Sequence, residues 1–180
     1  MKLSRKQFDA LALEHLDTLY RLARRLVGDP ARAEDLVQES YLRAVRSWQT
    51  FTLDERYGIR PWLVRILHNV YVTRGQQEGR QPRPVDGEAL DALSAREPSP
   101  SPELPDFDVL DERVAHALEA LPVEYKSVLL LWAVEGFAYK EIAEALDVPI
   151  GTVMSRLHRA RQRMAAALKD FAREQRLIRE

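Results

Sequence analysis

Apolar residues recur at intervals of three and four in two separate stretches of this chain, and the segment between them lacks that pattern. Such spacing places apolar side chains on one face of an α-helix. Residues 75–108 are rich instead in glycine, glutamine, serine, acidic residues and proline, a composition too polar to bury a core. No alternating strand pattern persists, and no repeat of fixed period is visible. We therefore expect an all-α protein with two small helical domains, residues 1–75 and 109–180, joined by a flexible, acidic, proline-rich linker at 76–108.

Three helices are expected in the first domain. The first covers residues 8–27 and stops at Gly28. Asp29 and Pro30 then supply an N-cap and a first-turn proline for the second helix. A third helix should begin at Arg60 and end near residue 74. The residues expected to be buried are Phe8, Ala12, Leu16, Leu19, Ala23, Leu26, Val27, Ala33, Leu36, Val37, Ser40, Ala44, Val45, Trp48, Leu63, Ile66 and Val70.

The second domain contains the spacing of a helix-turn-helix. Helical periodicity returns after the linker and is interrupted at Pro122 and Gly136. A short amphipathic helix at residues 139–146, a turn at 147–149 and an arginine-bearing helix from Gly151 follow in order. The residues expected to form the shared core of this motif are Ile142, Ala143, Leu146, Val148, Val153 and Leu157.

The second helix of this motif has a polar face suited to the major groove of DNA. Short hydroxyl side chains lie near its start and guanidinium groups lie further along. Arginine can donate two hydrogen bonds to guanine, whereas serine, threonine and lysine more often bind phosphates. A solvated basic helix is the alternative, but here a correctly spaced turn precedes the helix, so we predict binding to duplex DNA. The residues predicted to bind it are Lys140, Thr152, Ser155, Arg156, Arg159 and Arg163.

Composition excludes several other classes of function. The chain contains no cysteine, so disulfides, iron–sulfur clusters and thiol nucleophiles are excluded. Its four histidines stand singly, without the spacing of a metal site. No phosphate-binding glycine-rich loop or nucleophile elbow occurs, and no apolar run is long enough for a membrane span or a secretory signal. We expect a cytoplasmic protein with no metal, no cofactor, no enzymatic activity and no membrane insertion.

Four strings of residues together resemble the extracytoplasmic-function (ECF) sigma factors of bacterial RNA polymerase. The first domain contains A-E-D-L-V-Q-E at residues 33–39 and R-P-W-L-V-R-I-L-H-N at residues 60–69. The second contains L-P-V-E-Y from Leu121 and the more specific G-F-A-Y-K-E-I-A-E-A-L-D-V-P-I-G-T-V-M-S-R-L-H-R-A-R from Gly136. The resemblance covers nearly the entire chain. It implies that the two domains are regions two and four of a transcription initiation factor that recognises minus-ten and minus-thirty-five promoter elements.

The resemblance also implies roles for side chains of region two. Taken alone, A-E-D-L-V-Q-E would be an ordinary amphipathic helix with a solvated acidic edge, but the family docks this surface on the coiled coil of the polymerase beta-prime subunit. Asn69 is expected to line a pocket for a flipped base, and Tyr71 either stacks on a base or packs in the core. The residues expected to bind core polymerase are Asp35, Leu36, Gln38 and Glu39. The residues expected to contact the minus-ten strand are Arg65, Asn69, Tyr71, Thr73 and Arg74.

The implied partners are core RNA polymerase, through its beta-prime coiled coil and beta flap, promoter DNA in double- and single-stranded form, and a dedicated anti-sigma factor. The region-four string is similar to the oxidative-stress branch of the family, and sensing would then reside in the anti-sigma partner, which in some systems holds the sigma factor near the membrane. The chain departs from the family pattern at Ala138, where a capping serine is common, and at Asp147, where glycine is common. At Met154 some members have a base-facing arginine, so the minus-thirty-five sequence cannot be copied from them.

A conventional helix-turn-helix regulator is the main alternative. It would account for the second domain alone and would leave residues 29–74 unexplained. Such regulators usually dimerise, and the sequence contains no obvious dimerisation heptads. A helical interaction protein is a further alternative, against which the basic face of the reading helix argues. Transcription that depends on core polymerase would distinguish a sigma factor from both.

Overall fold

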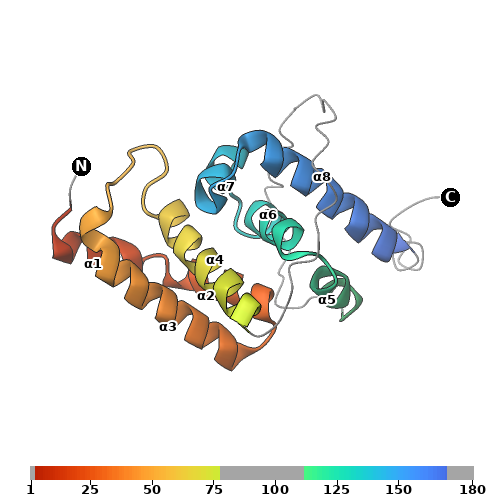
Figure 1. Cartoon of the computed structure of the whole chain (residues 1–180), viewed down its shortest axis with the longest axis horizontal. Helices are drawn as coiled ribbons and strands as arrows, with labels where there is room; N and C mark the ends of the chain where they lie inside the picture. The colour runs from red at the N-terminus through yellow and green to blue at the C-terminus, as the bar shows by residue number, and fades with distance from the viewer. Residues whose placement is uncertain (1–2, 78–111, 170–180) are drawn as a thin grey trace.

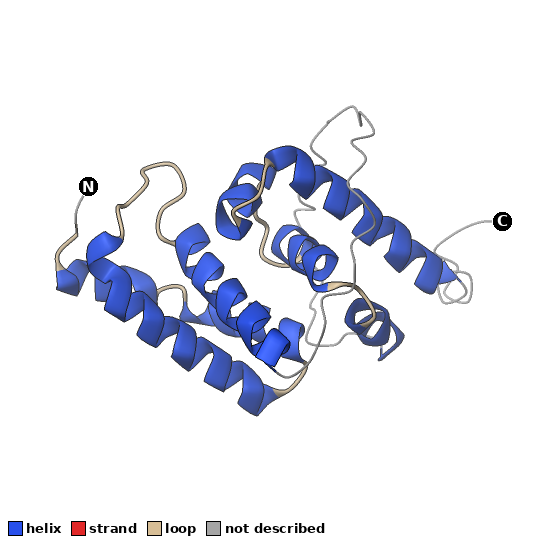
Figure 2. Cartoon of the chain, in the orientation of Figure 1, coloured by secondary structure: helices blue, strands red, loops and turns tan. Residues whose placement is uncertain are grey.

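The computed structural model describes residues 3–77 and 112–169, so nearly all of the predicted linker lies outside the described residues. Within those ranges the chain forms eight α-helices and one short 3-10 helix, with no β-strand (Figures 1 and 2). One isolated antiparallel bridge joins Asp54 to Gly58. The expected all-α class is confirmed. The division of the chain at residues 75 and 109 stays a prediction.

The first predicted helix is in fact two. Helix α1 (Arg5–Leu13) begins with a capping box, in which Ser4 N donates to Gln7 Oε1 at 2.9 Å. Helix α2 (Leu16–Val27) ends at Gly28, whose φ of 76° is left-handed. The prediction of one continuous helix over residues 8–27 was wrong, because the chain turns at His15 (φ −103°, ψ 6°). The turn directs α1 toward an aromatic cluster and α2 toward the remaining helices.

That aromatic cluster explains why α1 leaves the line of α2. Phe8 is fully buried, and its ring centroid lies 6.1 Å from that of Phe51 and 5.9 Å from that of Trp62. Both contacts are edge-to-face, the arrangement that aromatic quadrupoles favour. A straight helix would carry Phe8 away from the loop that supplies Phe51.

The other two helices of the first half of the chain, which the resemblance assigns to region two, begin where the sequence predicts. Helix α3 (Pro30–Ser47) is capped by Asp29, whose Oδ1 accepts a hydrogen bond from Arg32 N at 2.8 Å. The 3-10 helix η1 (Trp48–Thr50) follows, and helix α4 (Arg60–Gln77) extends three residues beyond its predicted end. Leu63 and Val70 are buried as expected and Ile66 is half-buried. Helix α4 also buries Pro61, Val64, Leu67 and Tyr71, because it packs on its neighbours with more than one face.

The second half of the chain, which the resemblance assigns to region four, contains four helices. They are α5 (Glu112–Glu119), α6 (Val123–Ala133), α7 (Tyr139–Leu146) and α8 (Ile150–Ala167). Pro122 is the N-cap of α6, and Gly136 (φ 65°) lies in the turn before α7. Asp147 ends α7 with a left-handed φ of 56°, the only such value at a non-glycine residue in the described parts of the chain. The predicted helix-turn-helix is therefore present.

The core of that motif differs in detail from the prediction. Ile142, Val153 and Leu157 are buried as expected. Ala143, Leu146 and Val148 are only half-buried, whereas Ala145 is fully buried. The short α7 thus packs on its neighbours with a slightly rotated face.

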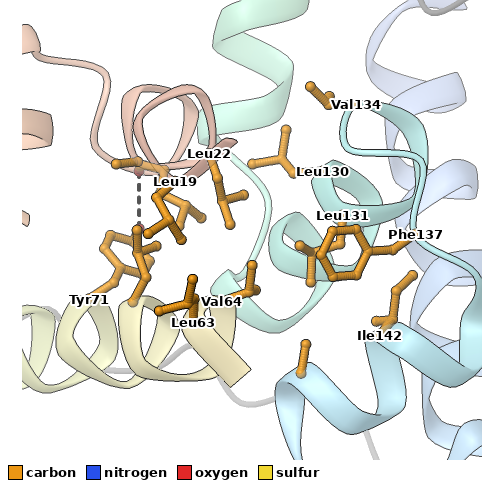
Figure 3. Packing of buried hydrophobic residues seen from close by; sticks show 14 of the residues in the cluster. Leu19, Leu22, Leu63, Val64, Tyr71, Leu130, Leu131, Val134, Phe137 and Ile142 are labelled. Carbon is orange, nitrogen blue, oxygen red and sulfur yellow. Dashed lines mark hydrogen bonds between the residues drawn. The ribbon is translucent and has the colours of Figure 1, made fainter. Parts of the chain in front are cut away.

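The two regions share one continuous hydrophobic core. Helix α4 packs against α7, and α2 packs against α6. Figure 3 shows Leu22 and Val64 of region two on the side that faces Leu130, Leu131 and Ile142 of region four. Burial of such side chains stabilises the contact by about 1.5–3 kcal/mol each. The described regions therefore form one closed body.

Candidate nucleic-acid and polymerase interface

Three of the residues predicted to contact the minus-ten strand form one strip along α4. Arg65, Asn69 and Thr73 are spaced by four positions, which places them on one side of the helix. Asn69 and Thr73 are exposed, and the Thr73 hydroxyl donates to the Asn69 carbonyl at 2.8 Å. The Asn69 amide offers both donors and an acceptor at the surface. This strip is called the α4 strip below.

The other two residues of that set lie elsewhere. Tyr71 is 9% exposed, and its hydroxyl donates to the Leu26 carbonyl at 3.2 Å. In this conformation Tyr71 packs in the core, which is one of the two roles considered for it, and the Tyr71 ring cannot stack on a base. Arg74 points toward α3, where its Nε lies 2.8 Å from Glu39 Oε2 and its Nη2 donates to the Asp35 carbonyl at 3.3 Å.

The surface predicted to bind polymerase is only partly exposed. Asp35 and Gln38 are exposed on α3, but Leu36 is 1% exposed and belongs to the core. Glu39 accepts hydrogen bonds from both Arg74 and Arg43. Although partial burial of Glu39 opposes ionisation, these hydrogen bonds lower the pKa of its carboxyl below the ordinary value. Glu39 is therefore a firmly ionised group at the edge of this surface.

Sequence reasoning missed an apolar residue on the same side of α3. Leu42 is 54% exposed and follows Asp35 and Gln38 by seven and four positions. That spacing places all three on one side of the helix. The signal was present in the sequence, because Leu42 falls outside the buried stripe of α3.

The DNA-reading face predicted on α8 is partly covered in this conformation. Lys140 and Arg163 are exposed, whereas Thr152, Ser155, Arg156 and Arg159 are half-buried. The Arg156 Nε atom is fully buried, and the Arg163 guanidinium lies 5.2 Å from the centroid of the Tyr125 ring. Ser155 donates its hydroxyl hydrogen to the Thr152 carbonyl at 3.1 Å. Arg156 would have to be uncovered to reach base edges.

Ion pairs between the two regions were also missed by the sequence reasoning. Arg60 Nη2 lies 3.0 Å from Glu141 Oε1, and Arg65 Nη2 lies 3.2 Å from Glu144 Oε1. Arg21 Nη2 lies 3.2 Å from Glu135 Oε2. No pattern in the sequence pairs these charges, because the partners are separated by 79 to 114 positions.

Glu135 is the most buried of these acidic groups. Its side chain is 2% exposed. Lys126, also buried, donates from Nζ to the Leu26 carbonyl at 3.1 Å, a second polar contact between the two regions. Burial raises the pKa of the Glu135 carboxyl, an effect that the guanidinium groups of Arg21 and Arg60 partly offset. The contact between the regions thus contains charged groups taken out of water.

Among residues 3–77 and 112–169, histidines and carboxylates form no group that could hold a metal ion. In the same ranges, no helix is both long and apolar enough to cross a membrane.

Comparison with known families agrees with this arrangement of helices. Residues 11–81 match the model of sigma-70 region 2, and residues 111–164 match that of sigma-70, region 4. The helix-turn-helix and the α4 strip therefore lie in the two regions that define sigma-70 proteins. Within that class, the chain belongs to the ECF sigma factors.

The relatives include ECF sigma factors from distant bacteria. The chain is 32% identical over 165 residues to the ECF RNA polymerase sigma-E factor of Salmonella typhimurium, covering 87% of this chain and 84% of that protein. It is 36% identical over 167 residues to the ECF RNA polymerase sigma factor SigE of Mycolicibacterium smegmatis, covering 93% of this chain but 63% of that longer protein.

A solved structure has a similar fold. The sigma factor RpoE from Bartonella quintana, crystallised in complex with the anti-sigma factor NepR, matches with a TM-score of 0.68 at 27% identity. The match covers 91% of this chain and 98% of that one. CnrH, solved with the cytosolic domain of CnrY, matches at 22% identity and a TM-score of 0.63, which shows a shared fold.

Proposed function

We propose that this protein is a promoter-specificity subunit of bacterial RNA polymerase that acts without enzymatic activity of its own. The observation that carries the proposal is the presence, in one chain, of a helix-turn-helix and of a separate strip on α4, where the exposed Asn69 and Thr73 can meet a single strand. A conventional regulator needs only the first. The protein would act in the cytoplasm, where polymerase and the chromosome are found.

Binding to core polymerase would use the exposed side of α3. Asp35, Gln38 and Leu42 combine an acidic, an amide and an apolar group along one side of the helix. Such a surface suits a partner helix that offers basic and apolar side chains. We assign the beta-prime coiled coil to this surface and the beta flap to region four.

Promoter recognition would divide between the two regions. Region four would bind the duplex minus-thirty-five element through α8, with Arg156, Arg159 and Arg163 contributing contacts to bases and phosphates. Region two would hold the melted minus-ten strand along the α4 strip, with Asn69 bonding to the edge of a flipped base. Melting would draw on binding energy, because a protein of this kind hydrolyses no nucleotide.

Control by an anti-sigma factor is part of this proposal. The structural relative from Bartonella quintana was solved with such a partner. This chain matches the family in both region two and region four. An anti-sigma factor that covers the α3 surface or the α4 strip would block polymerase or DNA.

The experiment that tests the proposed function is run-off transcription from a fragment library of the source genome. Core polymerase is supplied with and without this protein. We expect discrete new transcripts whose start sites share two spaced upstream elements. Duplex binding by the protein alone, without new start sites when polymerase is added, would contradict the proposal and favour a conventional regulator.

A further inference from the structure

Arginines of region two meet acidic groups of region four where α4 packs against α7. The Arg60 guanidinium donates to Glu141 Oε1 at 3.0 Å and to the Glu135 carbonyl at 3.4 Å. It also lies 3.9 Å from the centroid of the Phe137 ring, so that one side chain meets a carboxylate, a carbonyl and an aromatic face. Arg60 is 28% exposed and Glu141 18% exposed, which limits screening of the pair by solvent.

Arg65 makes a second set of contacts with the same helix. Its Nε donates to the Glu144 backbone carbonyl at 3.1 Å, and its Nη2 donates to Glu144 Oε1 at 3.2 Å. Asp147 Oδ1 lies 3.7 Å from Nη2. A guanidinium group binds the oxygens of a carboxylate and those of a phosphate with the same planar set of donors. Region four thus presents to Arg65 the type of acceptors that a DNA strand would present.

The closed body cannot engage both promoter elements at once. Packed helices lie about 8–10 Å apart between their axes, and α4 packs directly on α7. Two promoter elements separated by about two helical turns lie roughly 70 Å apart at ~34 Å per turn. Region two must therefore separate from region four before α4 and α8 can reach their two elements.

We infer that the contact between α4 and α7 is a self-inhibitory latch. In it Glu144 occupies Arg65, which the phosphates of the melted DNA strand would otherwise bind, and Glu141 holds Arg60 so that the two regions stay closed. The assignment of Arg65 to DNA rests on the proposed function, whereas the closed arrangement rests on the contacts alone. When a protein binds only in its open form, its apparent affinity is the affinity of the open form multiplied by the fraction of molecules that are open. Weakening the latch therefore strengthens binding to single-stranded DNA.

Variants on α7 test the latch without altering α4. Glu144→Lys places a cation opposite Arg65, and the side chain of Glu144 is 59% exposed, so the change is compatible with folding. Glu141→Gln removes the charge opposite Arg60 but keeps an amide oxygen to accept from Ala138 N, a bond that starts α7 at 2.9 Å. Asp9→Lys is the matched control, because it makes the same change of charge in a pair that lies within α1.

The opening is measured by energy transfer between two dyes on the full chain. The protein contains no cysteine, so Arg46→Cys on α3 and Gln162→Cys on α8, both at exposed positions, can be labelled specifically. We expect one population of high transfer efficiency for the parent and for Asp9→Lys. Glu144→Lys should show a second, low-efficiency population, and Glu141→Gln should show a smaller one.

The same labelled proteins are titrated with a 30-nucleotide single-stranded DNA of mixed sequence. Glu144→Lys should bind about tenfold more tightly than Asp9→Lys, because a larger fraction of it is open. Transfer efficiencies equal to the parent's in both α7 variants would overturn the latch. Opening of Glu144→Lys without tighter binding than Asp9→Lys would overturn the competition between carboxylates and DNA. Neither readout uses polymerase or a promoter, so failure of the latch is distinguishable from failure of the proposed function.

Discussion

His68 gives the folded protein a measurable sensitivity to acid. It lies in α4, and its Nε2 atom is buried without a hydrogen-bond partner among the described residues. Burial and, second, the positive charge of Arg156 lower the pKa of His68 from 6.5 to about 4. The imidazole is therefore neutral in the folded protein at pH 7, and protonating it there costs free energy.

The sign and size of the effect follow from linkage. Between pH 6.5 and about 4 the unfolded chain binds a proton at His68 that the folded protein does not bind. The free energy of unfolding therefore falls as the pH falls through this window. At roughly 1.36 kcal/mol per pKa unit the full loss is about 3.4 kcal/mol, of which about 2.5 kcal/mol is reached by pH 4.5.

Urea denaturation of three proteins at pH 7.0 and pH 4.5 tests this account. His68→Gln has no titrating group at position 68, and His116→Gln, at an exposed position on α5, is the control. The wild type and His116→Gln should lose about 2.5 kcal/mol more between the two pH values than His68→Gln does. The reasoning is refuted if His68→Gln loses as much stability on acidification as the wild type.

Three further predictions concern stability and are measured by urea denaturation at pH 7. Phe8→Ala should cost about 3–5 kcal/mol, because it empties the centre of the aromatic cluster; a cost below 1 kcal/mol would show that the cluster collapses around the change. Gly28→Ala should cost about 1–2 kcal/mol, since φ is 76° and the new Cβ would lie 3.3 Å from Glu119 Oε1; a neutral result would contradict the strain argument. Ala138→Ser should add about 1 kcal/mol, because only the Glu141 half of that capping box can form with alanine; no gain would show that the hydroxyl does not reach its acceptor position.

Local chemistry made most helix ends predictable from the sequence. Pro30 and Pro122 fix φ at the starts of helices, and Gly28 and Asp147 accept the left-handed conformation at the ends of helices, whatever surrounds them. The turn at His15 has no such residue, because the chain bends there to bury Phe8 against residues far away in the sequence. A helix break that tertiary packing imposes leaves no local signal.

The candidate site was predictable to the extent that helical spacing decides it. Asp35 and Gln38 on α3, and Asn69 and Thr73 on α4, are exposed in positions that the period of a helix predicts. Tyr71 was not decidable, because α4 buries several faces and its apolar residues do not mark a single inner side. The latch was beyond prediction for another reason: each of its acidic and basic residues is ordinary on its own helix, and only the tertiary structure pairs them.

The central claim is that region two holds the melted minus-ten strand while region four binds the duplex minus-thirty-five element. Its most direct test is promoter opening at a start site found by the run-off experiment. Reactivity of unpaired minus-ten thymines to permanganate reports melting. Competition by a duplex that contains the minus-thirty-five element reports binding to double-stranded DNA. We predict that Asn69→Ala slows melting while leaving duplex affinity unchanged, and that Arg159→Ala weakens duplex affinity by about 1–3 kcal/mol. Loss of duplex affinity in Asn69→Ala, or normal duplex affinity in Arg159→Ala, would contradict the account.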